Sequence, residues 1–368
     1  MGVVRFDRIA KECRETHKGG FEGIPIVGLE HIEPYELRLK NYDINIETTF
    51  TKRFHEGQIL FGRRRAYQHK ACVATFDGIC SGDITVIEPI EGQVYPGLLP
   101  FIIQNDDFFE HAIKGSNGAL SPRVKWEHMA NYEVNLPSFA EQKHLAEKLW
   151  AAYEVKQSYL KMIKATQEMV QSQFIEMFYS NNNYEKISLT SVSDFQGGSQ
   201  PPKKEWISNP APGYIRMLQI RDFTQSEKDN VEYVKISNSI KTCEESDILI
   251  GRYGASVGKI LTGLSGAYNV AIMKTIPNTD IINRVYFKYF LLSNYFQKNI
   301  IRVGNGRGAQ AGFNKEDLSN FIIPLPPMEE QNKFEMIYNQ ADKSISELRK
   351  SIDSIDIVIK SLINENLL

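Results

Sequence analysis

The sequence predicts a mixed α/β protein made of two related halves, each of which ends in a long helix. A shift of 189 residues lays residues 136–142 (LPSFAEQ) on 325–331 (LPPMEEQ), and residues 59–63 (ILFGR) on 248–252 (ILIGR). A stretch with helical apolar spacing follows residues 136–142, and another follows residues 325–331. A chain of 368 residues is long enough for two or three domains with cores of their own.

The same offset carries Ile26 onto Ile215 and Leu29 onto Leu218. A duplicated chain can fold with internal pseudo-twofold symmetry and present two related faces to the two half-sites of a DNA duplex. An ordinary gene duplication that stabilises a fold without a symmetric ligand explains the repeat equally well at this point.

Residues 1–137 form the first predicted α/β domain. Short apolar runs at 24–29, 58–62 and 83–89 lie between glycines, prolines and charged residues, as strands do. Residues 101–109 (FIIQNDDFF) are predicted to form one helix with an aromatic face.

Residues 138–180 are predicted to form a long helix. It opens with a capping box, in which Ser138 and Glu141 satisfy free N–H groups of the first turn. An apolar seam with steps of three and four follows, interrupted at Lys156 and Gln173. Its members are Leu145, Leu149, Ala152, Tyr159, Ile163, Thr166, Val170 and Met177.

Residues 181–326 repeat the α/β domain and residues 327–368 repeat the helix. The polar residues 181–183 mark a domain boundary, and Pro326 and Pro327 introduce the second helix. The second seam is unbroken and has the period of a coiled coil. Its members are Phe334, Tyr338, Ala341, Ile345, Leu348, Ile352, Ile355, Ile359 and Leu362.

The two seams predict that the helices pair as an antiparallel coiled coil. Such a pair would be about 50–60 Å long at about 1.5 Å per residue, which exceeds one turn of DNA, about 34 Å. The helices would then act as a spacer between two recognition domains. The alternative is that each seam packs on its own α/β domain.

Composition predicts a cytoplasmic protein with free thiols. The sequence has no apolar run long enough to cross a membrane, no signal peptide and no C-x-x-C pair among its four cysteines. His69, Cys72 and Cys80 fit no standard zinc spacing, so we expect no metal site.

Basic residues cluster in loops, although the net charge is −2. Residues 52–70 contain six Lys and Arg against one acid, and residues 111–125 and 302–315 each contain three and no acid. Such loops are usually just solvated surface. Their recurrence at matching places in both halves favours binding to a polyanion.

These features together resemble the specificity (S) subunit of type I restriction–modification systems. Residues 247–259 (DILIGRYGASVGK) and 267–272 (AYNVAI) are similar to the central part of such a recognition domain. Residues 304–310 (GNGRGAQ) and 321–331 (FIIPLPPMEEQ) are similar to the segment that leads into its helix. The first half departs from this pattern at residues 63–70 (RRRAYQHK) and 116–123 (SNGALSPR), so residues transfer less directly to it.

The resemblance implies a chain that binds double-stranded DNA at a bipartite site, one part per recognition domain. It implies a scaffold for two modification subunits, which methylate adenine N6 with S-adenosylmethionine, and for restriction subunits that use ATP and magnesium. No cofactor is implied on this chain. The sequence agrees, because it contains neither an Asn-Pro-Pro-Tyr-like methyltransferase motif nor a phosphate-binding Walker loop.

The candidate DNA-binding residues are those whose side chains pair with phosphates or base edges. In the first domain they are Arg63, Arg64, Arg65, Lys70, Asn117, Arg123 and Lys125. In the second domain they are Arg216, Gln219, Arg252, Tyr253, Lys259, Asn305, Arg307 and Gln310. Each is also explained as a solvated loop residue, and the competing function is a coiled-coil protein–protein adaptor that does not bind DNA.

Overall fold

The computed structural model describes residues 2–114, 123–180, 183–224, 231–306 and 312–368. The chain forms two compact units, Met1–Lys161 with Leu348–Leu368, and Met162–Glu347. The two long helices, α4 (Phe139–Tyr179) and α10 (Met328–Leu367), each contribute to both units. The units therefore divide the helices, whereas the sequence assigned each helix as a separate segment.

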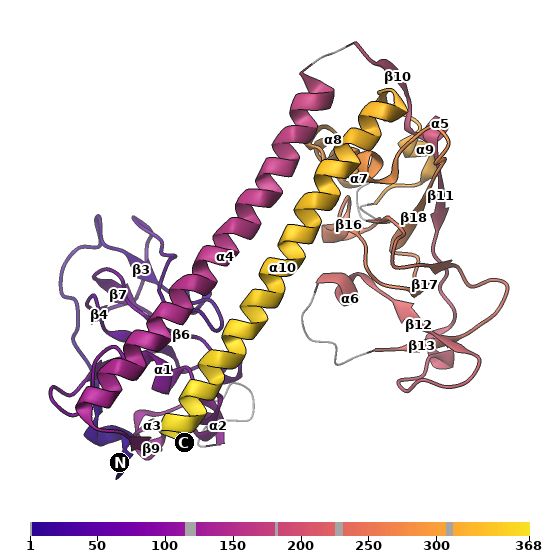
Figure 1. Ribbon diagram of the computed structural model, residues 1–368. Coiled ribbons are helices and arrows are strands. Elements are labelled where there is room, and N and C mark those ends of the chain that lie inside the picture. The colour runs from indigo at the N-terminus through magenta and orange to yellow at the C-terminus, as the bar shows by residue number, and fades with distance from the viewer. Residues whose placement is uncertain (1, 115–122, 181–182, 225–230, 307–311) are drawn as a thin grey trace. The chain divides into compact units, whose positions relative to one another are not determined.

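Unit 1 combines two small sheets, a two-stranded ribbon and short helices beside α4 (Figure 1). The sheet orders are β2-β8-β5-β6 and β3-β7-β4, and β1 pairs with β9. The strands are β1 (Gly2–Arg5), β2 (Ala10–Cys13), β3 (Ile26–Val27), β4 (Lys52–Phe54), β5 (Ile59–Gly62), β6 (Ala71–Val73), β7 (Gly78–Cys80), β8 (Ile84–Pro89) and β9 (Glu133–Leu136). The helices are α1 (Leu99–Ile103), α2 (Asp106–Lys114) and α3 (Trp126–Ala130).

The single helix expected over residues 101–109 is wrong: the structure has two helices there. α1 ends before Gln104, and α2 begins at Asp106. Asn105 separates them, because its side-chain oxygen accepts a hydrogen bond from the Asp107 N–H at 3.4 Å and caps the new helix. The aromatic face is retained, since Phe101, Phe108 and Phe109 are all buried.

Unit 2 repeats this topology with one additional edge strand, β13. Its sheets have the orders β11-β18-β15-β16 and β13-β12-β17-β14, and β10 pairs with β19. The strands are β10 (Glu185–Ser188), β11 (Ser193–Gly197), β12 (Tyr214–Leu218), β13 (Tyr233–Lys235), β14 (Thr242–Cys243), β15 (Leu249–Gly251), β16 (Ile260–Leu261), β17 (Gly266–Tyr268), β18 (Ile272–Pro277) and β19 (Ile322–Leu325). The helices are α5 (Leu189–Val192), α6 (Ile220–Thr224), α7 (Arg284–Leu292), α8 (Asn294–Asn305) and α9 (Lys315–Leu318).

The repeat is confirmed by strand pairing, but its offset is not constant. β3 runs parallel to β7, and β12 runs parallel to β17. Val27 pairs with Cys80 in the first of these, and Leu218 pairs with Tyr268 in the second. Val27 therefore corresponds to Leu218 and Ile26 to Met217, an offset of 191, so the expected matches of Ile26 with Ile215 and of Leu29 with Leu218 are each wrong by two residues.

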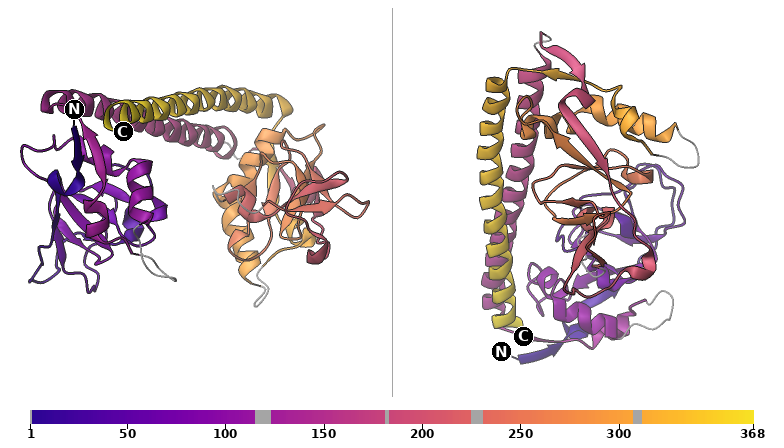
Figure 2. Two further views of the ribbon diagram at one scale, coloured as in Figure 1. Left: turned by 90° about the horizontal axis from the view of Figure 1, so that it is seen from below. Right: turned by 90° about the vertical axis from the view of Figure 1, so that its right-hand side faces the viewer.

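The long helices pair antiparallel within each unit, as Figures 1 and 2 both show. In unit 1 the beginning of α4, with Leu145 and Leu149, shares a hydrophobic core with the end of α10, at Ile363. In unit 2 the end of α4 meets the beginning of α10, where the rings of Phe174 and Phe334 lie 5.3 Å apart. Lys156, which interrupts the first seam, forms an ion pair with Asp356 at 2.6 Å.

Each helix also packs on the α/β part that precedes it, so both packing alternatives hold. In unit 1, the Trp150 Nε1–H donates to the Gly97 carbonyl at 2.8 Å, and its ring lies 5.2 Å from that of Phe101. The predicted capping box is present, since Glu141 Oε2 accepts from the Ser138 N–H at 2.9 Å. The proposed polar joint at 181–183 lies largely outside the described residues.

Candidate nucleic-acid interface

Two basic segments of unit 1 that are far apart in the sequence lie side by side. Arg63 and Arg64 follow directly after β5, and Arg64 forms an antiparallel bridge with Arg123. The Val124 N–H donates to the Arg63 carbonyl at 2.9 Å, and the Arg63 N–H donates to the Asp83 carbonyl at 2.9 Å. The structure thus brings together the two parts of the chain that the sequence selected separately.

A single carboxylate lies between two of these arginines. Asp83 accepts from Arg123 at 2.7 Å and lies 3.7 Å from Arg64. One negative charge does not neutralise two guanidinium groups, so the loop remains cationic. Arg65 is exposed and has a left-handed backbone with φ of 55°. Lys125 is exposed immediately before α3.

Lys70 has a structural contact. Its Nζ donates to the Leu29 carbonyl at 2.7 Å, and its own carbonyl accepts from the Gly62 N–H at 2.8 Å. The amine is only half-exposed. We therefore assign Lys70 to closing the loop between β5 and β6.

Unit 2 builds the same loop at the same place. Tyr253 bridges Gly312, which is the exact repeat of the Arg64–Arg123 bridge at an offset of 189. The Gly251 N–H donates to the Lys259 carbonyl at 2.9 Å, as Gly62 does to Lys70 in unit 1. Tyr253 is 42% exposed, and Lys259 is also exposed.

Arg252 is held by main-chain acceptors. Its Nε donates to the Phe313 carbonyl and its Nη1 to the Val270 carbonyl, both at 3.3 Å. Its guanidinium also lies 5.0 Å from the centre of the Tyr253 ring, within the range of a cation–π contact. Asn305, exposed, is the last residue of α8. Asn117, Arg307 and Gln310 lie outside the described residues.

Arg216 and Gln219 belong to a separate cluster that contains carboxylates. Arg216 Nη2 donates to Asp222 at 2.7 Å, and Gln219 Nε2 donates to Glu232 at 3.0 Å. Glu232 also accepts from Arg221 at 2.8 Å. These side chains are therefore paired internally, on the sheet that contains β12 and β13 rather than on the loop after β15.

The sequence missed residues that share a pocket with Arg63 and Lys125. Arg14, Trp126 and Glu127 line this pocket of about 570 Å³ in unit 1. Trp126 and Glu127 follow Lys125 directly, and this adjacency was the available signal. Arg14 is 49 residues before Arg63 in the sequence, so no local pattern could have associated them.

Among the described residues, no group of three or more His, Cys, Asp or Glu side chains is arranged to hold a metal ion. Cys72 and Cys80 are buried, and burial raises the pKa of the Cys80 thiol to about 12. The His69 ring stacks on Tyr35 with 4.7 Å between ring centres, and burial lowers the pKa of His69.

Across the parts of the chain that the structure describes, no helix has both the length and the apolar character needed to cross a membrane.

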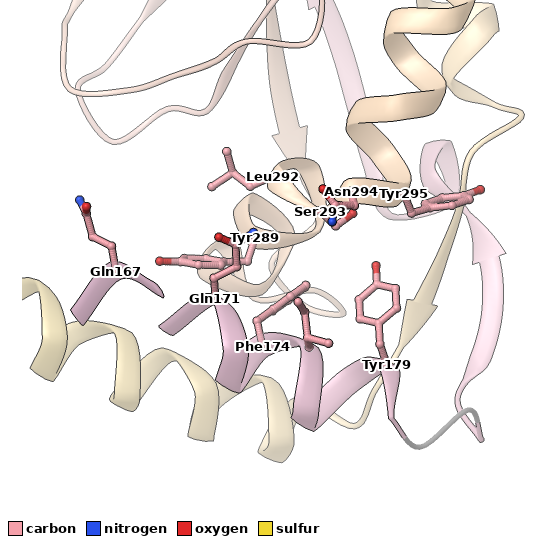
Figure 3. Close-up of a pocket in the computed structure, with 10 residues that line it drawn as sticks. Gln167, Gln171, Phe174, Tyr179, Tyr289, Leu292, Ser293, Asn294 and Tyr295 are labelled. Atoms are coloured by element: carbon pink, nitrogen blue, oxygen red, sulfur yellow. The ribbon is translucent and has the colours of Figure 1, made fainter. Parts of the chain in front are cut away.

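A second pocket, of about 510 Å³, lies in unit 2 between the end of α4 and the α7–α8 turn (Figure 3). Gln171 and Phe174 project from α4 toward Tyr289 and Tyr295 on the opposite wall. Several apolar side chains at its rim are exposed, among them Ile175, Leu292 and Tyr295. This surface has the apolar character of a protein-binding site rather than of a DNA-binding one.

Residues 181–355 match the family model of the type I restriction modification DNA specificity domain. The whole chain is similar to a protein of Methanocaldococcus jannaschii described as the putative type I restriction enzyme MjaX specificity subunit. The two are 22% identical over 396 residues, which cover 99% of this chain and 90% of that protein.

Solved structures share the fold along the whole chain. The S subunit of the type I restriction–modification system from M. genitalium superposes with a TM-score of 0.58 and 12% identity, covering 100% of this chain and 96% of that one. A chain from a study of complex assembly and conformational transition of a type I restriction–modification system superposes with a TM-score of 0.54 and 18% identity. The match covers 99% of this chain and 97% of that one. The matched family model, the curated relative and the duplicated topology support the reading of the chain as a type I restriction–modification specificity subunit, and the solved structures share its fold.

Proposed function

We propose that this chain is a type I specificity subunit and that it binds a bipartite site in double-stranded DNA, with one recognition unit for each half of the site. The observation that carries the proposal is the repeated loop. Arg64 bridges Arg123 in unit 1, and Tyr253 bridges Gly312 at the corresponding place in unit 2. A fold that varies its side chains on one fixed backbone arrangement is suited to reading two different half-sites.

The side chains on these loops have the chemistry that duplex DNA requires. Arginine and lysine bind phosphates, and arginine also pairs with guanine in the major groove. Unit 1 presents Arg64, Arg65 and Arg123, and unit 2 presents Tyr253, Lys259 and Asn305. Tyr253 can contact both the sugar–phosphate backbone and base edges.

We further propose that the chain is not itself catalytic. The motifs for adenine methylation and ATP binding are missing from its sequence, so two modification subunits would supply the methyltransferase and bind S-adenosylmethionine. Restriction subunits would use ATP and magnesium. The long helices and the apolar pocket beside Phe174 offer a surface on which such partners can assemble.

The competing function, an adaptor that binds proteins only, accounts for the helices and the apolar pocket. It does not account for the bridged arginines Arg64 and Arg123. It also does not explain why both units repeat the same loop. DNA recognition accounts for both features.

The experiment is to express the chain with its modification subunit, map methylated adenines in the cellular DNA, and measure binding to the mapped site by gel shift. We expect a two-part motif with an unread gap. Arg64→Ala together with Arg123→Ala should weaken binding, whereas Lys164→Ala, an exposed residue of α4, should not. Equal affinity of the double variant and the wild type, or methylation without any sequence motif, would contradict the proposal.

A further inference from the structure

Arg63 lines a pocket of unit 1, and its side chain is bonded differently from that of Arg252, the corresponding arginine of unit 2. It lies where the end of β2, the beginning of β4 and the beginning of α3 meet, and has a volume of about 570 Å³. Arg63, Lys125 and Glu127 line it together with Glu12 and Arg14. The first three of these come from the two segments that the Arg64–Arg123 bridge holds together.

The side chain of Arg63 has no hydrogen-bond or ion-pair partner among the described residues, and its Nε is buried. Its repeat mate, Arg252, donates instead to the carbonyls of Val270 and Phe313. The corresponding carbonyls of unit 1 belong to Gly82 and Val124, and neither accepts from Arg63. Because no acceptor among the described residues holds its guanidinium, Arg63 has donors left for a ligand in the pocket that it lines.

The different behaviour of the two arginines has a local cause in the neighbouring strand. In unit 1, Cys13 pairs with Val86, and the residue after it is Arg14. In unit 2, the corresponding residue after Gln196 is Gly197, and a Cβ there would lie only 3.1 Å from the Arg252 guanidinium. Glycine therefore leaves room for Arg252 to fold back onto the main chain, whereas the corresponding position of unit 1 carries the side chain of Arg14.

The pocket presents carboxylates as well as cations, so it can accept hydrogen bonds from a ligand as well as donate them. Glu12 is paired with Arg14 at 2.8 Å, and the Lys52 amine donates to the Ile84 carbonyl at 2.7 Å. The Glu127 carboxylate acts electrostatically on Arg14 but accepts no side-chain hydrogen bond among the described residues, so it can accept one from a ligand. A G·C pair presents the acceptors O6 and N7 on guanine and an amino donor on cytosine in the major groove.

We propose that this pocket reads one G·C pair of the first half-site: Arg63 donates to O6 and N7 of the guanine, and Glu127 accepts from the N4 amino group of the cytosine. The proposal rests on the proposed function, because it concerns the same DNA-binding surface. It assigns base reading to Arg63 and leaves phosphate contacts to the exposed arginines Arg64, Arg65 and Arg123.

The test uses the complete complex with its modification subunit and a panel of duplexes in which each position of the mapped site carries all four base pairs. We expect Arg63→Ala to lower the affinity for the cognate site by about 5- to 150-fold and to abolish the preference for G·C at one position. Preferences in the other half-site should be unchanged. Glu127→Ala should relax the preference at the same position.

Arg63→Lys separates reading from charge, since lysine keeps the cation but loses the two-pronged geometry. It should retain non-specific binding and lose most of the preference at that position. Arg65→Ala is the matched control, because it removes a neighbouring exposed arginine and should weaken all duplexes alike. Thermal melting and co-purification with the modification subunit check that each variant is folded.

Two results would overturn the inference while leaving the proposed function intact. One is an Arg63→Ala complex that loses affinity equally for every duplex, which indicates a phosphate contact. The other is an unaltered sequence preference in both Arg63 variants. If the wild-type complex itself binds no duplex and methylates no motif, the proposed function fails instead.

Discussion

At the scale of single residues, two buried glutamines explain why residues 136–142 and 325–331, which both end in Gln, are repeated. Gln142 and Gln331 are 4% and 0% exposed. Each Nε2 donates to the carbonyl of a preceding proline, Pro137 at 3.0 Å or Pro326 at 2.8 Å. Each Oε1 accepts a main-chain N–H of the α/β part, at 2.8 Å and 2.7 Å. The glutamine thus fastens the first turn of each long helix to the recognition unit before it.

We expect Gln331→Ala to destabilise unit 2 by about 1–3 kcal/mol, because the half-buried Asn283 N–H and the buried Pro326 carbonyl both lose their partner. Denaturant unfolding followed by circular dichroism measures the change. Gln340→Ala, an exposed residue of the same helix, should change the free energy of unfolding by less than about 0.5 kcal/mol. Equal stability of the two variants would show that the glutamine is not a structural fastener.

A second residue-scale prediction concerns His55. Its Nδ1 lies 3.0 Å from Asp77 and its Nε2 lies 3.0 Å from Glu15. The hydrogen bond to Asp77, followed by that to Glu15, raises the pKa of His55 above its ordinary value. Because the folded-state pKa is the higher one, the stabilisation is fully present below the unfolded pKa of about 6.5. It is lost as the pH rises through the folded pKa.

NMR titration of His55 in the wild type should therefore give a pKa above about 6.5, and Asp77→Asn should lower it. The side chain is 38% exposed, so solvent screening keeps the contribution to stability below about 1 kcal/mol. His55→Gln should remove the corresponding loss of stability on raising the pH. A His55 pKa at or below the ordinary value would exclude the two-carboxylate interaction.

At the scale of elements, the long helices were predictable and the short ones were not. The seam residues and the capping box are local patterns, and α4 and α10 begin and end close to the predicted bounds. The break between α1 and α2 depends on a single asparagine cap, which periodicity does not detect. The two-residue shift at β3 reflects an insertion that only the pairing of Val27 with Cys80 reveals.

For the candidate site residues too, local patterns were predictable and tertiary contacts were not. The sequence identified the cationic loops, because basic residues cluster there with at most one acid. It could not show that Lys70 is bound to the Leu29 carbonyl or that Arg216 is bound to Asp222. These partners are set by tertiary packing.

The helix pairing leads to a prediction at the element scale. Phe334 of α10 is fully buried in unit 2, with ring centres 5.3 Å from Phe174, 5.7 Å from Phe178 and 5.0 Å from Tyr289. Phe334→Ala should destabilise unit 2 by about 3–5 kcal/mol, because it opens a cavity in this aromatic cluster. Met336→Ala, two residues away and 72% exposed, is the control. Similar unfolding midpoints for both variants would argue against the antiparallel packing of these helix ends.

At the scale of the whole molecule, the two units share a topology but differ in how their cations are compensated. In unit 2, Lys315 pairs with Asp194, and the positions that correspond to Arg64 and Arg123 hold the uncharged Tyr253 and Gly312. In unit 1, by contrast, Arg64 and Arg123 share one carboxylate, and Arg65 and Lys125 are exposed. Among the described residues, unit 1 therefore offers more positive charge at this bridge than unit 2 does.

This asymmetry predicts that unit 1 supplies most of the salt dependence of DNA binding. Each phosphate contact contributes a slope of about 0.9 to the logarithm of the binding constant against that of the salt concentration. Replacing Arg64 and Arg123 by alanine should reduce the slope by up to the contribution of two phosphate contacts, about 1.8. Lys315→Ala should change the slope by less than the contribution of one phosphate contact, because Asp194 already compensates that cation.

Binding of the complex to its mapped site, measured between 50 and 300 mM salt (roughly the range over which counterion release is resolved), tests this prediction. A slope that is flat in the wild type, or that Lys315→Ala lowers as much as the arginine pair does, would show that the charge difference between the units does not act on DNA.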